Sequence, residues 1–343
     1  MTVAVSATAL RRLGEDILTA NGTPADLAAV VSNSLVEANL AGHDSHGVLR
    51  LVSYAERVRS GKVQPAARAR IESRHGATGR IDGAWGWGQP AAHLAVEAAI
   101  GIAREHGVAV VTVAHCNHIG RLGEYVERLT QQGMVAMAMC NANSLVAPYG
   151  GRSRLLGTNP FAFAAPRKTA SEPILLDFAT AAVAEGKLRV ARAKHQAVPP
   201  GLIIDPSGHP TTDPEDFYSG GALLPFGGHK GYGMSIMVEV LGGVLSGTGA
   251  SCLPDYTGGN GTVILAIDIG SYLPLDAFMS QSDALGSMIK QSPRADESTE
   301  ILIPGEPEAL SRRQRRDKIQ LPVQTWTEIK TLADQFGVDP KRT

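Results

Sequence analysis

The spacing of apolar residues predicts that the chain begins with a small helical unit. Apolar side chains recur every three or four residues over 6–20, which is the period of one helical face. The same period continues over 24–42, and a third helix is expected to begin at Asp44 or Ser45 and to end near residue 61. This opening segment therefore predicts three consecutive helices.

Further along, uninterrupted apolar runs predict strands. Val108–His115 and Met134–Cys140 are such runs, and a helical pattern over 120–133 lies between them. A strand, a helix and a second strand in this spacing predict a parallel pair with a crossover connection. Further strands are expected over 161–166, 174–179 and 262–268.

Three later segments complete the predicted elements. The apolar window 231–247 contains Glu239 and five glycines, so it is expected to be a buried helix and not a membrane span. The basic run SRRQRRDK over 311–318 is expected to be a solvated face, because the protein as a whole is close to neutral. A final helix is expected over 325–336.

The composition is that of a soluble globular protein long enough for two domains. The 343 residues are 43% hydrophobic and 19% charged. Because 32 basic and 33 acidic residues nearly cancel, neither a nucleic acid nor an anionic membrane is expected as a partner. Three widely spaced cysteines form no disulfide framework, and no signal peptide is recognised, so a cytoplasmic location is expected.

The stretch GHDSHGVLRL over 42–51 gathers groups suited to acid–base chemistry. On the third predicted helix, His46, Arg50 and Tyr54 are four residues apart and share one face. Arg50 is suited to hold a carboxylate through two parallel hydrogen bonds. The positive end of the helix dipole would keep the pKa of His46 near or below neutrality, a useful range for a general acid or base. A solvated helix face is the alternative interpretation.

A second group of polar residues follows the first two predicted strands. His118 comes just after the first strand, and Asn141 comes at the end of the next. In open α/β sheets, ligands bind outside the carboxyl ends of the strands. The histidines His43, His46, His115 and His118 also raise the alternative of a metal site, although no cysteine or acidic partners complete one nearby.

Two further stretches carry polar groups in apolar surroundings. The glycine-rich segment 225–240 leads into a predicted helix with Lys230 near its start, an arrangement suited to an anion or phosphate. Tight helix packing explains the same glycines, and the spacing is neither a Rossmann nor a Walker motif. Asp177 lies among apolar residues and needs a partner if it is buried, for which a buried histidine is the expected candidate.

Taken in order, seven short motifs resemble one known family. The motifs are DSHG, NHIG, VAPYGG, LGTNPFAFAAP, LLDFAT, GGHKGYG and IPGEPE. The chain resembles the malate/L-lactate dehydrogenase family of the non-Rossmann type. The resemblance implies a homodimer and an α/β fold in which a mixed-sheet nicotinamide-binding domain is joined to a mainly helical domain formed from both chain ends. It places residues 1–70, 228–257 and 300–343 in the helical domain, and 71–227 and 258–299 in the α/β domain.

Carried over residue by residue, the resemblance implies roles for particular positions. The catalytic positions are His46 and His118, each matching a histidine proposed as the proton donor, and Asp177, expected to orient a histidine. The positions that match substrate contacts are Ser45, Arg50, Tyr54 and Thr158. The positions that match cofactor contacts are Asn141, Ala142, Pro173, Ile174, Leu175, Leu176, Asp177, Phe178, Ala179, His229, Lys230, Gly305, Glu306 and Pro307.

The predicted activity is hydride transfer between a nicotinamide and C2 of a small 2-hydroxy or 2-oxo acid, or a related cyclic imino acid. The cofactor is expected to be NAD or NADP, with NAD slightly favoured, and no metal is expected. One alternative is a metal-dependent lyase or hydrolase that uses His43, His46, His115 and His118. The other is a non-catalytic protein that binds a small acid.

Overall fold

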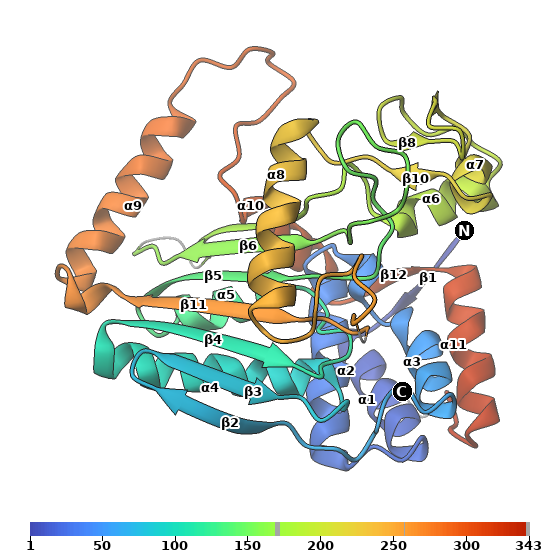
Figure 1. The fold of residues 1–343 in the computed structure, drawn as a ribbon, viewed down its shortest axis with the longest axis horizontal. Coiled ribbons are helices and arrows are strands. Elements are labelled where there is room, and N and C mark those ends of the chain that lie inside the picture. Colours follow the sequence, from blue (N-terminus) through green and yellow to red (C-terminus); the bar gives the residue numbers. More distant parts are fainter. Residues whose placement is uncertain (169–171, 257, 341–343) are drawn as a thin grey trace.

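A mixed seven-stranded sheet is the centre of the fold in the computed structural model, which describes residues 1–168, 172–256 and 258–340 (Figure 1). In spatial order its strands are β2 (Arg70–His75), β3 (Thr78–Asp82), β4 (Val108–Ala114), β11 (Thr262–Asp268), β5 (Met134–Cys140), β6 (Pro160–Ala165) and β7 (Ile174–Ala179). Only β3 and β4 are parallel neighbours, and the other neighbouring pairs are antiparallel. The predicted strands over 108–115, 134–140, 161–166, 174–179 and 262–268 are confirmed.

One detail of the predicted strand pairing is wrong. β4 and β5 run in the same direction and are connected through α5 (Gly123–Thr130), as the pattern indicated. They are not bonded to each other, because β11 lies between them and is antiparallel to both. The strand over 262–268 could be predicted from local apolar spacing, but its position between two strands that lie more than a hundred residues earlier could not.

Helices cover both faces of the sheet because its central strands are apolar on both sides. In β5, Ala136 and Ala138 belong to the core formed with α4 (Gly88–His106) and α5. The alternate residue Met139 points to the opposite face and packs with Val238 of α8 (His229–Val238) and with Val263. Figure 1 shows α8 crossing in front of the sheet.

The two ends of the chain form a second core beside the sheet. Its helices are α1 (Ala7–Ala20), α2 (Ala25–Leu40), α3 (Arg50–Arg59) and α11 (Val323–Gln335). Leu13, Leu35, Tyr54 and Leu332 are buried together in it. The strands β1 (Thr2–Val5) and β12 (Ile319–Pro322) pair antiparallel and fasten the ends to each other. The predicted fold class, a mixed sheet beside a helical part built from both ends, is confirmed.

Smaller elements complete the structure. They are α6 (Glu185–Ala193), α7 (Pro214–Tyr218), α9 (Leu275–Lys290), α10 (Glu306–Arg315) and the short strands β8 (Ile203–Ile204), β9 (Pro210–Thr211) and β10 (Ala222–Leu223). The short strands form a separate sheet in the order β10-β8-β9. Figure 1 shows α9 projecting away from the helices at the chain ends.

The predicted buried helix over 231–247 is buried on one face only. It consists of α8 followed by a π-helical turn over Glu239–Val244. Glu239 is buried, whereas Val240, Val244 and Leu245 are each at least half exposed. The glycines allow the inner face to approach the sheet closely: a Cβ at Gly242 would lie 2.9 Å from the Gly261 carbonyl oxygen. This segment packs on the sheet, whereas the resemblance placed 228–257 with the helical part. Among the described residues, no helix is long and apolar enough to cross a membrane.

Candidate active site

The segment that carries His46 is a short 3-10 turn and not the start of an α-helix, as we had expected. The turn spans Asp44–His46, and the α-helix begins only at Arg50. The cause lies in Asn39, whose Oδ1 accepts a hydrogen bond from Val48 N at 2.8 Å and whose Nδ2 donates to Asp44 Oδ1 at 2.6 Å. A Cβ at residue 47 would lie 2.2 Å from Asn39 Oδ1, so only glycine permits this approach. Arg50 and Tyr54 do share the first turns of α3.

Around this turn, the side chains of Ser45, His46 and Arg50 are held in a fixed relation. Ser45 Oγ lies 3.0 Å from His46 Nδ1. Arg50 Nε donates to the Ser45 carbonyl oxygen at 2.7 Å, which fixes the guanidinium and leaves both Nη groups without a recorded partner among the described residues. Two parallel N–H donors on a half-buried guanidinium match the geometry of a carboxylate.

His118 comes from the other side of the site and meets the helical part directly. Its Nδ1 lies 2.7 Å from the Tyr54 hydroxyl oxygen, and its ring is stacked on that of His46 with 5.5 Å between centroids. The five positions Ser45, His46, Arg50, Tyr54 and His118, chosen from sequence for chemistry, are therefore brought together.

Both histidines of the stack are held in the neutral form. Burial and the nearby Arg50 lower the pKa of His46 to about 3, so the low pKa does not come from the helix dipole that we had invoked. Burial, Arg50 and His46 lower the pKa of His118 well below its usual value. Burial raises the pKa of Tyr54 to about 12, so its hydroxyl keeps its hydrogen at neutral pH.

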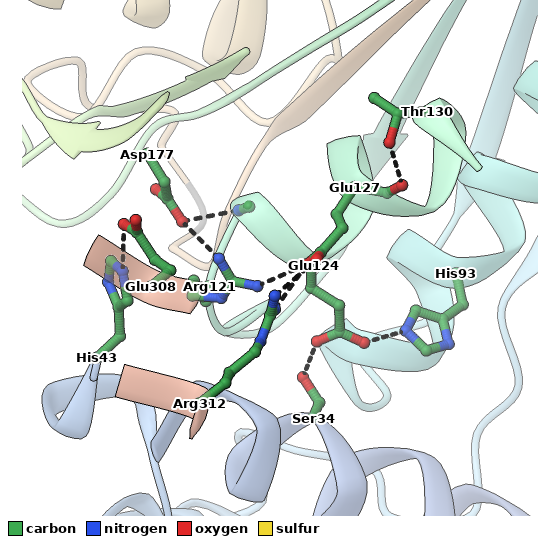
Figure 2. Close-up of polar contacts among 11 residues, drawn as sticks. Ser34, His43, His93, Arg121, Glu124, Glu127, Thr130, Asp177, Glu308 and Arg312 are labelled. Carbon is green, nitrogen blue, oxygen red and sulfur yellow. Dashed lines mark hydrogen bonds and ion pairs between the residues drawn. The ribbon is translucent and has the colours of Figure 1, made fainter. Parts of the chain in front are cut away.

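Asp177 has a different partner from the buried histidine that we expected. Its Oδ2 accepts a hydrogen bond from Gly123 N at 2.7 Å and lies 3.9 Å from Arg121 Nη1 (Figure 2). Burial raises the pKa of Asp177 in spite of Arg121, which acts to lower it. The carboxylate therefore fastens the first turn of α5, three to five residues beyond His118.

A network of charged side chains surrounds this contact. Arg121 and Arg312 both reach Glu127, at 3.2 and 2.7 Å, and His43 Nε2 lies 3.3 Å from Glu308 (Figure 2). The basic run over 311–318 is thus not simply a solvated face. A neutral overall charge did not reveal that Arg312 pairs with Glu127, an acidic partner that is itself partly buried.

The positions expected to contact a cofactor gather around the edge strand β7. At one end of it, Leu175 N donates to the Pro304 carbonyl oxygen at 3.0 Å, and Gly305 packs against Pro173. Gly305 has a φ of 99°, and a Cβ there would lie 2.8 Å from the Pro173 carbonyl oxygen. Glu306 bonds Lys290, and with Pro307 it starts α10.

At its other end, β7 approaches the segment before α8. Phe226 N donates to the Thr180 carbonyl oxygen at 3.0 Å, and the rings of Phe178 and Phe226 are 5.6 Å apart. His229 and Lys230 follow at the exposed start of α8. Most of the expected cofactor positions therefore lie along or next to one strand whose outer edge pairs with no other strand in the part of the chain that the structure describes.

Three other expected positions lie at the ends of β5 and β6, and each has a backbone or side-chain polar group that is already hydrogen-bonded within the protein. Asn141 is fully buried, and its Nδ2 donates to Glu239 at 3.1 Å and to the Gly249 carbonyl oxygen at 2.9 Å. Ala142 N donates to Asn159 Oδ1 at 3.2 Å. Thr158 lies beside Thr180, whose N and hydroxyl both donate to its carbonyl oxygen. The structure records no contact between these positions and His46 or His118.

The comparisons with known proteins agree on one family. The family model for malate/L-lactate dehydrogenase matches residues 5–330. The chain is 36% identical to an L-lactate dehydrogenase from Cupriavidus necator, over 97% of this chain and 98% of the relative. The chain belongs to the malate/L-lactate dehydrogenase family.

Solved structures of the malate/L-lactate dehydrogenase family have the same fold. The sulfolactate dehydrogenase from Methanocaldococcus jannaschii superposes with a TM-score of 0.90 at 32% identity, covering 99% of both chains. The delta1-piperideine-2-carboxylate reductase from Pseudomonas syringae gives 0.86 at 32% identity, covering 97% of this chain and 100% of that one. Members of the family are thus dehydrogenases and reductases, and its dehydrogenases imply a nicotinamide cofactor.

Family membership disfavours the metal-dependent alternative, and the geometry agrees. The four histidines divide among separate partners: His43 lies near Glu308, His115 near Asp82, and only His46 and His118 face each other. Among the described residues, no group of three or more histidine, cysteine, aspartate or glutamate side chains is arranged to hold a metal ion.

Sequence reasoning missed two buried residues beside the site. Gln89, in the first turn of α4, donates from Nε2 to the Tyr54 hydroxyl at 2.8 Å. Arg121 is the ion-pair partner of Asp177. A signal existed for each: Arg121 is a charged residue three positions after His118, and Gln89 is a polar residue just before Pro90 and two alanines.

Proposed function

We propose that this member of the malate/L-lactate dehydrogenase family interconverts a small 2-hydroxy acid and its 2-oxo acid, or reduces a related cyclic imino acid. The observation that carries the proposal is the cluster of Arg50, His46, Tyr54 and His118, in which a cation with free donors lies near two neutral imidazoles. Such a set can bind a carboxylate and exchange a proton with an adjacent oxygen.

Arg50 would hold the substrate carboxylate. Its Nε is occupied by the Ser45 carbonyl oxygen, so the two Nη groups are oriented before any ligand arrives. A guanidinium fixed in advance loses little side-chain freedom on binding. The carboxylate would then set the position of C2 relative to the histidines.

His46 or His118 would exchange the proton at the substrate oxygen. Both rings are neutral at physiological pH, and one nitrogen of each is already engaged, His46 by Ser45 and His118 by Tyr54. The remaining nitrogen, Nε2, has no recorded partner among the described residues in either case. Asp177 would act from a distance, by fixing the helix turn that follows His118.

The residues around β7 fit a nicotinamide cofactor. Gly305 lets its segment pack tightly on β7, since a Cβ there would lie 2.8 Å from the Pro173 carbonyl oxygen, and β7 has an outer edge that pairs with no other strand among the described residues. Residues 173–179, Gly305 and Lys230 would hold the group. When bound, it would supply or accept the hydride at C2. We expect NAD or NADP to fill this role, with NAD slightly favoured.

We further propose a cytoplasmic homodimer in which the chain ends, 1–70 and 300–343, act as one unit beside the sheet. Val240, Val244 and Leu245 are exposed apolar side chains of the π-helical turn that follows α8 and of the residue just after that turn. They support a dimer interface at this turn. Light scattering of the purified protein, with and without Val244→Glu, tests the dimer.

A paired screen of NAD and NADP against pyruvate, oxaloacetate, larger 2-oxo acids and cyclic imines tests the activity. We expect turnover with at least one pair, and Arg50→Met should abolish it while cofactor fluorescence titration stays normal. His46→Ala and His118→Ala, measured in parallel, identify the proton donor by the larger loss of turnover. Cofactor binding without turnover of any substrate in the screen would contradict the proposal.

A further inference from the structure

Gln89 is a buried side chain whose amide makes a single recorded hydrogen bond. It is fully buried, its Nε2 donates to the Tyr54 hydroxyl at 2.8 Å, and its Oε1 is buried without a partner among the described residues. An unpaired buried carbonyl oxygen is costly, and an apolar side chain of similar size would avoid that cost. The bond to Tyr54 is therefore the feature that explains a glutamine here.

The backbone next to Gln89 packs closely against the residues of the candidate site. A Cβ at Gly88 would lie 2.4 Å from the carbonyl oxygens of both Asn117 and His118, so the start of α4 packs directly on the segment that carries His118. Trp87 packs on Tyr54 with 5.3 Å between ring centroids. Gln89, Tyr54 and His118 thus form a chain of contacts with little freedom to rearrange.

The contacts among Gln89, Tyr54 and His118 determine where the hydrogens of the Tyr54 hydroxyl and the His118 ring lie. The Tyr54 hydroxyl oxygen receives the hydrogen of Gln89 Nε2, and its own hydrogen has one recorded acceptor among the described residues, His118 Nδ1 at 2.7 Å. Were the imidazole hydrogen on Nδ1 instead, two donors would point at the oxygen and the Tyr54 hydrogen would be buried without an acceptor. Leaving a buried hydroxyl hydrogen unpaired disfavours that arrangement by about tenfold or more.

We propose that Gln89 is a positioning residue that acts through Tyr54 to hold neutral His118 in the tautomer with its hydrogen on Nε2. The low pKa of His118 keeps the ring neutral, and the high pKa of Tyr54 keeps the hydrogen on its hydroxyl. Both protonation states agree with the hydrogen bonds from Gln89 to Tyr54 and from Tyr54 to His118. Tyr54 is then not simply a substrate contact, because its hydroxyl is committed to the histidine.

The use of this tautomer rests on the proposed function. With Nδ1 occupied, His118 offers an N–H at Nε2, and an N–H is the group that a carbonyl oxygen accepts from. The resting enzyme is therefore prepared to bind the 2-oxo acid, whose oxygen has no hydrogen of its own.

Nitrogen-15 NMR of the imidazole groups in histidine-labelled enzyme, without substrate, tests the proposal. The His118 signals are identified by their loss in His118→Gln. We expect the wild-type ring to carry its hydrogen on Nε2, in a ratio of about ten to one or more. In Gln89→Met, a thioether sulfur replaces the donor at similar volume, and the Tyr54 hydrogen can turn toward this weak acceptor, so the ratio should fall toward unity. We expect kcat to fall by about twofold with cofactor affinity unchanged.

Two controls separate this effect from a general disturbance. The signals of His115, which faces Asp82, should not change in Gln89→Met, and Gln131→Met at an exposed position should change neither histidine. If Gln89→Met does not fold, Tyr54→Phe serves instead, and the His118 Nδ1 signal should move to the position of a nitrogen without a donor.

A hydrogen on Nδ1 in the wild-type enzyme overturns the proposal, because it means that the Gln89 amide presents its oxygen to Tyr54. An unchanged ratio in Gln89→Met overturns it as well. If the tautomer is as proposed and no 2-oxo acid is reduced, the proposed function fails and the assignment of Gln89 stands.

Discussion

Ser34→Ala should destabilise the protein more than an otherwise similar serine replacement on the same helix. The Ser34 hydroxyl donates to Glu124 Oε2 at 2.5 Å, and His93 Nε2 lies 2.6 Å from Oε1 of the same buried carboxylate (Figure 2). Hydrogen bonds to a charged group are worth about 1.5–3 kcal/mol, so the free energy of unfolding should fall by about that amount. Ser32→Ala is the matched control, because Ser32 is equally buried on α2 and donates to a neutral oxygen, the Arg11 carbonyl.

The control variant Ser32→Ala should lower the free energy of unfolding by only about 0.5–1.5 kcal/mol. The two variants should also differ in pH dependence. Burial opposes ionisation of Glu124, but the bonds from His93 and Ser34 outweigh it and lower its pKa below the usual 4.5. The stability from the ionised carboxylate is therefore complete above about 4.5 and is lost as the pH falls through the folded-state pKa. The cost of Ser34→Ala should shrink in acid, whereas that of Ser32→Ala should not.

Urea unfolding followed by circular dichroism, at neutral pH and at several acidic values, measures both costs as shifts of the midpoint at unchanged slope. If Ser34→Ala and Ser32→Ala lower the free energy of unfolding equally at neutral pH, and with the same pH dependence, the reasoning is refuted. That result would mean that Glu124 draws its stabilisation from His93 alone.

Other predictions concern the site directly. Arg50→Lys keeps the charge but loses the planar fork, so kcat/KM should fall by about 10- to 150-fold, a loss of about 1.5–3 kcal/mol, and steady-state kinetics should place most of it in KM. Gly305→Ala places a Cβ against the Pro173 oxygen at a φ of 99°, so it should lower the melting temperature and weaken cofactor binding in fluorescence titration. Because His46 and His118 have folded-state pKa values below the unfolded value of 6.5, the unfolded state binds more protons below that pH. Stability should then fall with decreasing pH by about 1.4 kcal/mol per unit for each histidine, and His118→Gln should show the shallower slope in urea titrations.

The strands could be predicted from sequence more completely than their arrangement. Runs such as Met134–Cys140 are apolar on both faces, which is a local property, and the predicted bounds match the structure. The position of β11 between β4 and β5 is decided by contacts far apart in the chain. The strand β2 was not predicted, because all its residues are exposed and it lies at the sheet edge.

The site shows the same division between local pattern and distant partners. Arg50 and Tyr54 were placed on one helix face from their spacing, and that spacing holds in α3. The turn that carries His46 was missed, because it depends on Asn39 reaching forward to Val48. The partner of Asp177 was wrong for a related reason: a buried carboxylate requires a donor, but its identity, Arg121, is fixed only by the fold.

The segment that carries His118 is fastened to the helical part on both sides. Arg57 Nη2 donates to Asn117 Oδ1 at 2.8 Å, just before His118, and beyond it Arg312 reaches Glu127 at 2.7 Å. Each of these bonds has an ionised member, and each crosses from the helical part to the sheet. Because His46 and Arg50 lie on one side and His118 on the other, any opening that separated them would break these bonds together. The site is therefore formed in this structure without a ligand, and we expect its selectivity to come from the side chains that line it.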